Sequence, residues 1–188
     1  MLKVRWQGTK ALTSQMQIIV ARSNWLIPSK ENLGVSSTEN YGFTPLWALQ
    51  RHFYGFDADK DVRAALSKIP TSGVTVLENL SPKLFIVEQT KDPQRLKELA
   101  LALVQTADEY SVEHLLVCSF VDLRSKLDLS IIESIFKGFL SYCNAQNIEA
   151  VTVQFSSNEN YHKARAVLSR IKYDSIQEKY KSDDADVF

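Results

Sequence analysis

Glycine is scarce in this sequence, with only 6 glycines among 188 residues. Loops that bind phosphate through their backbone rely on glycine, because its missing Cβ lets the N–H groups approach the anion closely. Residues 121–128 follow a largely apolar stretch, residues 115–120, and contain no glycine. A phosphate loop built from glycine is therefore not expected there.

Cysteine and histidine are also few. The two cysteines, Cys118 and Cys143, and the three histidines stand far apart, without the paired spacing of a zinc signature or a disulfide framework. The sequence has no Gly-x-Ser-x-Gly motif, which argues against hydrolysis by a serine nucleophile. We therefore expect no metal, no cofactor and no catalytic residue.

An excess of charge of either sign is missing as well. Lys+Arg and Asp+Glu number 22 each, so the net charge does not indicate nucleic-acid binding, although a local basic patch would still permit it. No apolar run reaches the length of a membrane span, and the first residues lack an apolar signal region. We expect a cytoplasmic protein that has no contact with membranes.

What the sequence does contain is a regular alternation of apolar patterns. Period-two or continuously apolar stretches predict six strands, at residues 2–7, 16–21, 73–78, 83–88, 114–119 and 148–155. Stretches with helical periodicity predict helices at residues 44–55, 59–69, 93–110, 130–143 and 157–172. The polar residues 22–43 predict one long connection.

This order of elements predicts an α/β fold, a three-layer α/β/α sandwich around a central six-stranded mixed sheet. The strand at residues 114–119 is apolar along most of its length and is expected near the sheet centre. Helix starts are expected at Asp92–Pro93 and at two capping-box spacings, Ser130 with Glu133 and Ser156 with Glu159.

Three local motifs resemble those of macro domains, which bind ADP-ribose and related nucleotides. Residues 151–161 read Val-Thr-Val-Gln-Phe-Ser-Ser-Asn-Glu-Asn-Tyr, similar to the last strand and helix start of that family. Residues 18–26, Ile-Ile-Val-Ala-Arg-Ser-Asn-Trp-Leu, and the Gly8-Thr-Lys turn resemble two further family motifs in the expected order. The resemblance covers residues 1–172 as a macro-like domain, with residues 173–188 as a polar, acidic tail. It also implies that the strands starting at Met16 and Ile148 flank the strand at residues 114–119.

The sequence departs from the family pattern at several positions. Thr9 stands where the family has an aspartate that binds adenine, and Ala21 replaces the first asparagine of its strand-end motif. The family's glycine triplet is reduced to Leu33-Gly34-Val35, and its second phosphate loop falls on the glycine-free residues 121–128. The side chains of Arg124 and Lys126 are the candidates to replace the lost backbone cradle.

The resemblance implies a set of ligand-binding residues, each with a plainer alternative. Asn24 either contacts a ribose or simply ends a strand, Phe155 either stacks on a base or belongs to the core, and Arg124 and Lys126 either bind phosphate or are only solvated. The full set is Asn24, Gly34, Val35, Asp122, Arg124, Ser125, Lys126, Phe155 and Asn158.

The sequence thus favours a divergent, non-catalytic binding module that recognises ADP-ribose or a related nucleotide. Two alternatives stay open: a protein- or nucleic-acid-interaction module that keeps only the scaffold, and an enzyme that hydrolyses or processes ADP-ribose. Residues 183–188, three aspartates with Ala and a terminal Val-Phe, predict a tip that docks on a protein partner, with an ordinary acidic tail as the alternative.

Overall fold

The computed structural model describes residues 2–5, 16–22, 32–36, 59–68, 70–119, 126–155 and 157–185. Its strands are β1 (Leu2–Arg5), β2 (Gln17–Arg22), β3 (Asn32–Ser36), β4 (Val74–Leu77), β5 (Leu84–Val87), β6 (His114–Ser119) and β7 (Ala150–Phe155). Its helices are α2 (Asp59–Leu66), α3 (Pro93–Glu109), α4 (Leu129–Leu140) and α5 (Asn158–Ala185). The helix expected at residues 44–55 lies outside the described residues.

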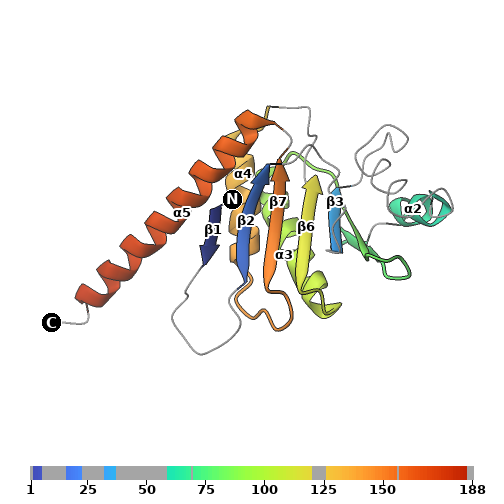
Figure 1. The fold of residues 1–188 in the computed structure, drawn as a ribbon, viewed down its shortest axis with the longest axis horizontal. Helices are drawn as coiled ribbons and strands as arrows, with labels where there is room; N and C mark the ends of the chain where they lie inside the picture. Colours follow the sequence, from blue (N-terminus) through green and yellow to red (C-terminus); the bar gives the residue numbers. More distant parts are fainter. Residues whose placement is uncertain are drawn as a thin grey trace.

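The strands form one sheet in the order β1-β2-β7-β6-β3-β5-β4 (Figure 1). The five inner strands run parallel, and the edge strands β1 and β4 pair antiparallel with their neighbours. β6 occupies the central position, which confirms the prediction for residues 114–119. The mixed α/β class is confirmed too.

Two details of the predicted sheet are wrong. The described residues form seven strands, not six, because β3 lies within the stretch that was expected to be a connection. As a result β6 is flanked by β7 and β3, and the strand near Met16 lies one position further out, beyond β7. β3 is a weak strand by composition, but it pairs on both sides, with β6 and β5, and this pairing outweighs its low intrinsic propensity.

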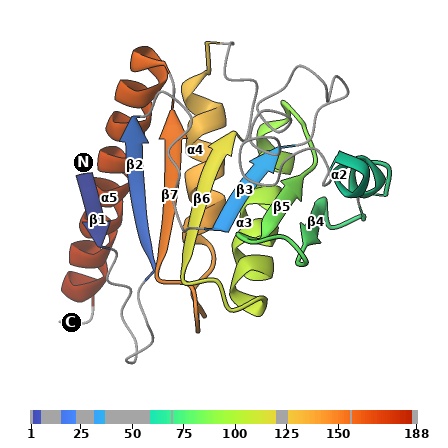
Figure 2. The ribbon, with the colours of Figure 1, turned by 45° about the vertical axis from the view of Figure 1, so that its right-hand side comes forward.

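Both faces of the sheet are buried. On one face, alternate residues such as Phe85, Leu115 and Val153 join a core cluster with apolar residues of α3, α4 and α5. Figure 2 shows these three helices on one side of the sheet. On the opposite face Leu84, Ile86 and Leu116 are buried as well. A sheet with both faces withdrawn from water is the middle of three layers, as the sequence predicted.

Helices α3 and α4 pack closely on each other because Gly138 has no side chain. A Cβ built on Gly138 would lie 2.3 Å from the carbonyl oxygen of Lys97 and 2.6 Å from the Cβ of Ala100. Any larger residue would push the two helices apart. The glycine therefore sets the spacing of the helical layer that covers the sheet.

Helix ends were predicted with mixed success. The carboxylate of Asp92 accepts hydrogen bonds from the backbone N–H groups of Gln94 and Arg95, which confirms the expected N-cap of α3. α4 begins at Leu129, so Ser130 lies inside the helix and not at its cap. In α5 the hydroxyl of Ser157 accepts from the N–H of Asn160, one residue later than the predicted capping box.

Helix α5 is longer than the sequence predicted. It was expected to end near Lys172 but continues to Ala185, and in Figure 1 its second half extends away from the sheet. Residues after position 172 include glutamate, glutamine and lysine, which are good helix formers. The docking role of residues 183–188 stays a prediction. No helix within the described ranges is both long and apolar enough to cross a membrane.

A buried carboxylate fixes the amino-terminal edge of the sheet. Asp108, near the end of α3, is 4% exposed, and its oxygens accept hydrogen bonds from the backbone N–H groups of Gln146, Asn147 and Ile148 at 2.6–3.1 Å. The Tyr142 hydroxyl donates to the same carboxylate at 2.7 Å. Burial alone would raise the pKa of Asp108, but these hydrogen bonds outweigh it and hold the pKa below its usual value. Burial and the contact with Asp108 raise the pKa of Tyr142 to about 12.

We predict that Asp108→Asn lowers the free energy of unfolding by about 2 kcal/mol, because an amide satisfies fewer of the buried N–H donors than a carboxylate does. Tyr142→Phe removes a single contact and serves as the milder control. Because the folded pKa is depressed, the contribution of Asp108 is present above its unfolded pKa, about 4, and is lost as the pH falls through the folded pKa. Urea unfolding at pH 7 and near pH 3 should show the gap between wild type and Asp108→Asn narrowing at acid pH. A gap that widens would contradict this account.

Candidate functional site

At the boundary between β6 and β3, the chain leaves two neighbouring parallel strands in diverging directions. From the carboxyl end of β6 the chain passes through α4 to β7 on one side, whereas from β3 it leads through α2 to β4 and β5 on the other. In open α/β sheets ligands bind outside the carboxyl ends of the strands at such a switch point. The carboxyl ends of β6 and β3 are therefore the candidate site.

The pairing of these two strands is irregular at this point. Gly34 of β3 pairs with Val117 of β6, but Val35 pairs with Ser119, so Cys118 is an extra residue in β6. Bulges of this kind bend a strand and end its pairing, and they are frequent beside binding sites. The structure thus brings Gly34 and Val35, two predicted ligand-binding residues, to the switch point.

The chain between β6 and α4 is anchored where it approaches α4. The N–H of Leu127 donates to the Oδ1 of Asn160 at 3.1 Å, and the Nζ of Lys163 donates to the carbonyl oxygen of Leu127 at 2.9 Å. The Leu127 side chain is buried in the core cluster. Both backbone polar groups of one residue are thus held by side chains from the start of α5.

A small group of charges surrounds this anchor. Glu159 of α5 lies 3.0 Å from the Nζ atoms of both Lys126 and Lys163. Hydrogen bonds from Lys126 and then Lys163 hold the pKa of Glu159 below its usual value. Two ammonium groups share one carboxylate, so the group carries a net positive charge at neutral pH. The Lys126 side chain is 73% exposed and stands at the carboxyl edge of the sheet.

Comparison with solved structures identifies the architecture. A glycine-to-valine variant of the Oceanobacillus iheyensis macrodomain, solved with ADPR, matches 92% of this chain and all of its own at 11% identity, with a TM-score of 0.68. The Trypanosoma brucei macrodomain in complex with ADP matches 80% of this chain and 68% of its own at 10% identity, with a TM-score of 0.59. The macro domain of ganglioside induced differentiation associated protein 2 matches 78% of this chain and 80% of its own, at 12% identity and a TM-score of 0.54.

The chain has the macrodomain fold. The resemblance read from its sequence is thereby confirmed at the level of architecture. No family model matches the sequence, and no curated protein matches it significantly. The likeness therefore lies in the structure, at sequence identities of 9–12%.

Two of the remaining predicted ligand residues, Phe155 and Asn158, are described within this macrodomain fold. Phe155, at the carboxyl end of β7, is 5% exposed and belongs to the core cluster, so the structure favours its core role over base stacking. Asn158 is exposed and opens α5, beside the charged group. Outside the described residues lie Asn24, Asp122, Arg124 and Ser125, whose assignments stay predictions.

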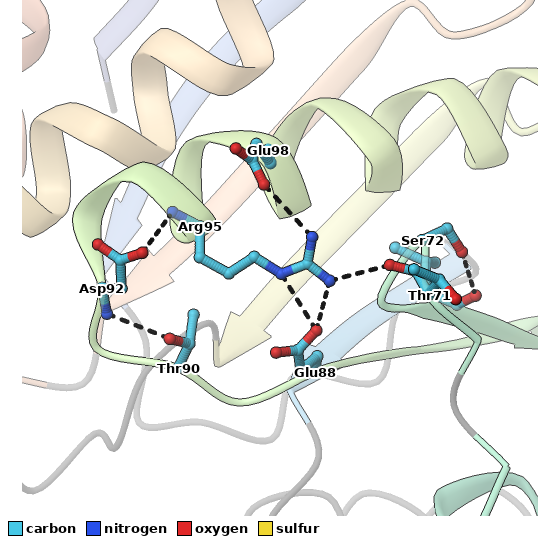
Figure 3. Close-up of polar contacts among 8 residues, drawn as sticks. Thr71, Ser72, Glu88, Thr90, Asp92, Arg95 and Glu98 are labelled. Atoms are coloured by element: carbon cyan, nitrogen blue, oxygen red, sulfur yellow. Dashed lines mark hydrogen bonds and ion pairs between the residues drawn. The ribbon is translucent and has the colours of Figure 1, made fainter.

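A second set of charges fixes the same edge of the macrodomain sheet beyond β3 (Figure 3). Glu88 directly follows β5, and its carboxylate accepts from the Nε and Nη2 of Arg95, the latter at 2.5 Å. Arg95 also donates to the carbonyl of Thr71 and to Glu98. The hydrogen bond to Glu88 is the main reason that the pKa of Arg95 is raised. These bonds tie the start of α3 to the segment before β4.

Sequence reasoning missed Asn160, Lys163 and Arg95. Asn160 stands inside the Asn-Glu-Asn-Tyr motif that carried the resemblance, so a signal was present, but it pointed to the exposed Asn158. The partners of Asn160 and Lys163 lie 33 and 36 residues away, beyond the reach of local patterns.

We predict that Arg95→Met lowers the free energy of unfolding by about 1 kcal/mol, the size expected for a partly exposed ion pair that also bonds a backbone carbonyl. Glu98→Gln is the matched control, because among the contacts of this guanidinium it changes only the one at 3.3 Å, while an amide oxygen at position 98 can still accept from the side chain of Gln94. Urea unfolding at low salt should show a clearly larger loss for Arg95→Met. Equal losses for the two variants would contradict the assigned role of the Glu88 and Thr71 contacts.

Proposed function

We propose that this chain is a binding module that recognises ADP-ribose or a related nucleotide at the carboxyl ends of β6 and β3. The observation that carries the proposal is the β6–β3 bulge at the switch point of a macrodomain sheet. Two structures of similar fold, the Oceanobacillus iheyensis variant and the Trypanosoma brucei macrodomain, are described with ADPR and ADP bound.

In this proposal side chains take over the binding of the phosphates. Residues 121–128 have no glycine, so each residue carries a Cβ that limits how closely a phosphate can approach its backbone N–H. Lys126, exposed and next to the anchored Leu127, supplies a positive charge at the ligand edge, and Arg124 supplies a second one. Asn24, Ser125 and Asn158 offer hydrogen bonds to sugar and phosphate oxygens, and Asp122 offers an acceptor for ribose hydroxyls.

We further propose that the module binds without catalysis. Turnover requires donors preorganised around the charge that develops in the transition state. One or two cationic side chains at the ligand edge can hold a pyrophosphate, but they do not surround the reacting atoms with donors as a backbone cradle does. Binding and turnover are therefore separable in one experiment.

We predict that isothermal titration with ADP-ribose gives saturable binding with one site per chain, and that Lys126→Gln weakens it about threefold, the loss of one exposed charge-assisted contact. Lys137→Gln is the matched control, because Lys137 is also an exposed lysine paired with a glutamate but lies on α4, away from this edge. ADP and AMP, titrated in parallel, show which part of the ligand is recognised.

The outcomes separate the three readings of the sequence. If Lys126→Gln and Lys137→Gln weaken nucleotide binding equally, the loss reflects the overall charge of the protein and not a contact made by Lys126. Absence of saturable binding for every nucleotide would overturn the proposal in favour of an interaction module that keeps only the scaffold. Chromatography of the recovered ligand should show it intact, and release of product from ADP-ribosylated protein would overturn the non-catalytic assignment.

A further inference from the structure

Leu127 is held at the ligand edge in an unusual way for a residue outside regular structure. Its side chain is buried, its N–H binds Asn160 and its carbonyl binds Lys163. Lys126, the residue proposed to meet the ligand, directly precedes it. The position of the Lys126 backbone is therefore set by contacts of the following residue with α5.

Asn160 is 3% exposed and is the buried polar side chain at the start of α5. Burying an amide is unfavourable unless it is hydrogen-bonded, so a buried asparagine whose oxygen accepts from a residue 33 positions away fixes a specific geometry. The backbone N–H of Asn160 donates to the hydroxyl of Ser157, which caps α5. The first turn of α5 and the Leu127 backbone are thus parts of one connected set.

Lys163 adds a second tie from the next turn of the helix. Its side chain is 24% exposed, and its ammonium contacts both the Leu127 carbonyl and Glu159. Glu159 in turn contacts the ammonium of Lys126. Lys126 is therefore held at both ends. Asn160 and Lys163 fix the backbone of the next residue, and Glu159 binds the Lys126 ammonium.

We propose that Asn160 and Lys163 are positioning residues that preorganise Lys126 for the anionic group of the ligand. This inference rests on the proposed function. Fixing a contact residue before the ligand arrives lowers the ordering entropy lost on binding, which is the usual origin of gains in affinity by preorganisation. The two residues act through Leu127 and touch no ligand themselves.

The first part of the test needs no ligand. In wild type the amide of Leu127 should be protected from hydrogen exchange, because its N–H binds a buried oxygen. Asn160→Leu removes the acceptor and should abolish that protection, whereas Asn160→Asp keeps an acceptor oxygen and should preserve it. Unchanged protection in Asn160→Leu would overturn the assignment.

The second part is a double-mutant cycle on the dissociation constant for ADP-ribose. Asn160→Leu and Lys163→Met should each weaken binding, at most by the roughly threefold loss expected for Lys126→Gln, because both residues act through Lys126. The decisive result is that Lys126→Gln, which weakens binding in wild type, has little further effect in either background. Additive effects would overturn the inference, because they would mean that Lys126 contributes equally to binding when Asn160 or Lys163 no longer holds the Leu127 backbone.

Controls keep structural damage and positioning apart. Glu133→Gln removes the ion pair between Glu133 of α4 and Arg170 of α5. Arg170 stands further along α5 than Asn160 and Lys163, so this variant should leave the dissociation constant unchanged. Lys163→Arg keeps a donor for the Leu127 carbonyl and should restore binding relative to Lys163→Met. If Asn160→Leu fails to fold, Lys163→Met carries the cycle. Absence of binding by wild type would instead overturn the proposed function, and this inference with it.

Discussion

The whole architecture depends on one constraint, the burial of both faces of a largely parallel sheet. Because β2, β7, β6, β3 and β5 run parallel, the chain must cross from the carboxyl edge back to the amino edge after β2, β5 and β6. Three of the described helices make up one covering layer, and the core cluster between them and the sheet contains most of the large apolar side chains. All five parallel strands therefore end at the same edge of the sheet. Polar residues that follow the strands gather there for topological reasons, whatever ligand they bind.

The two edges of the sheet are stabilised in different ways. At the amino edge the buried carboxylate of Asp108 collects three backbone N–H groups and a tyrosine hydroxyl in one compact arrangement. At the carboxyl edge the neutral amide of Asn160 and the ammonium of Lys163 hold the backbone of Leu127, and the other contacts around Lys126 are solvent-exposed ion pairs. Exposed ion pairs contribute little stability and exchange partners readily. The carboxyl edge is thus the one where a charged ligand can replace a protein partner at low cost.

The sequence predicted those parts of the fold that local patterns determine. The central strand was identifiable because residues 114–119 are apolar over most of their length, and the cap of α3 because Asp92–Pro93 is a strong local signal. β3 was missed because its stability comes from pairing with β5 and β6, residues far away in sequence. The same holds for the candidate site. Gly34 and Lys126 were predicted as ligand residues from the resemblance, but the anchoring of Leu127 depends on contacts across more than thirty residues.

The central claim is that a nucleotide binds where β6 and β3 separate. Backbone amide shifts followed by nuclear magnetic resonance during addition of ADP-ribose test it most directly. The account predicts that the largest shifts occur at Gly34, Val35, Lys126 and Leu127, while the amides around Asp108, at the opposite edge, keep their positions. Shifts centred on Gln146 to Ile148, or along the second half of α5 with none at the β6–β3 bulge, would contradict it.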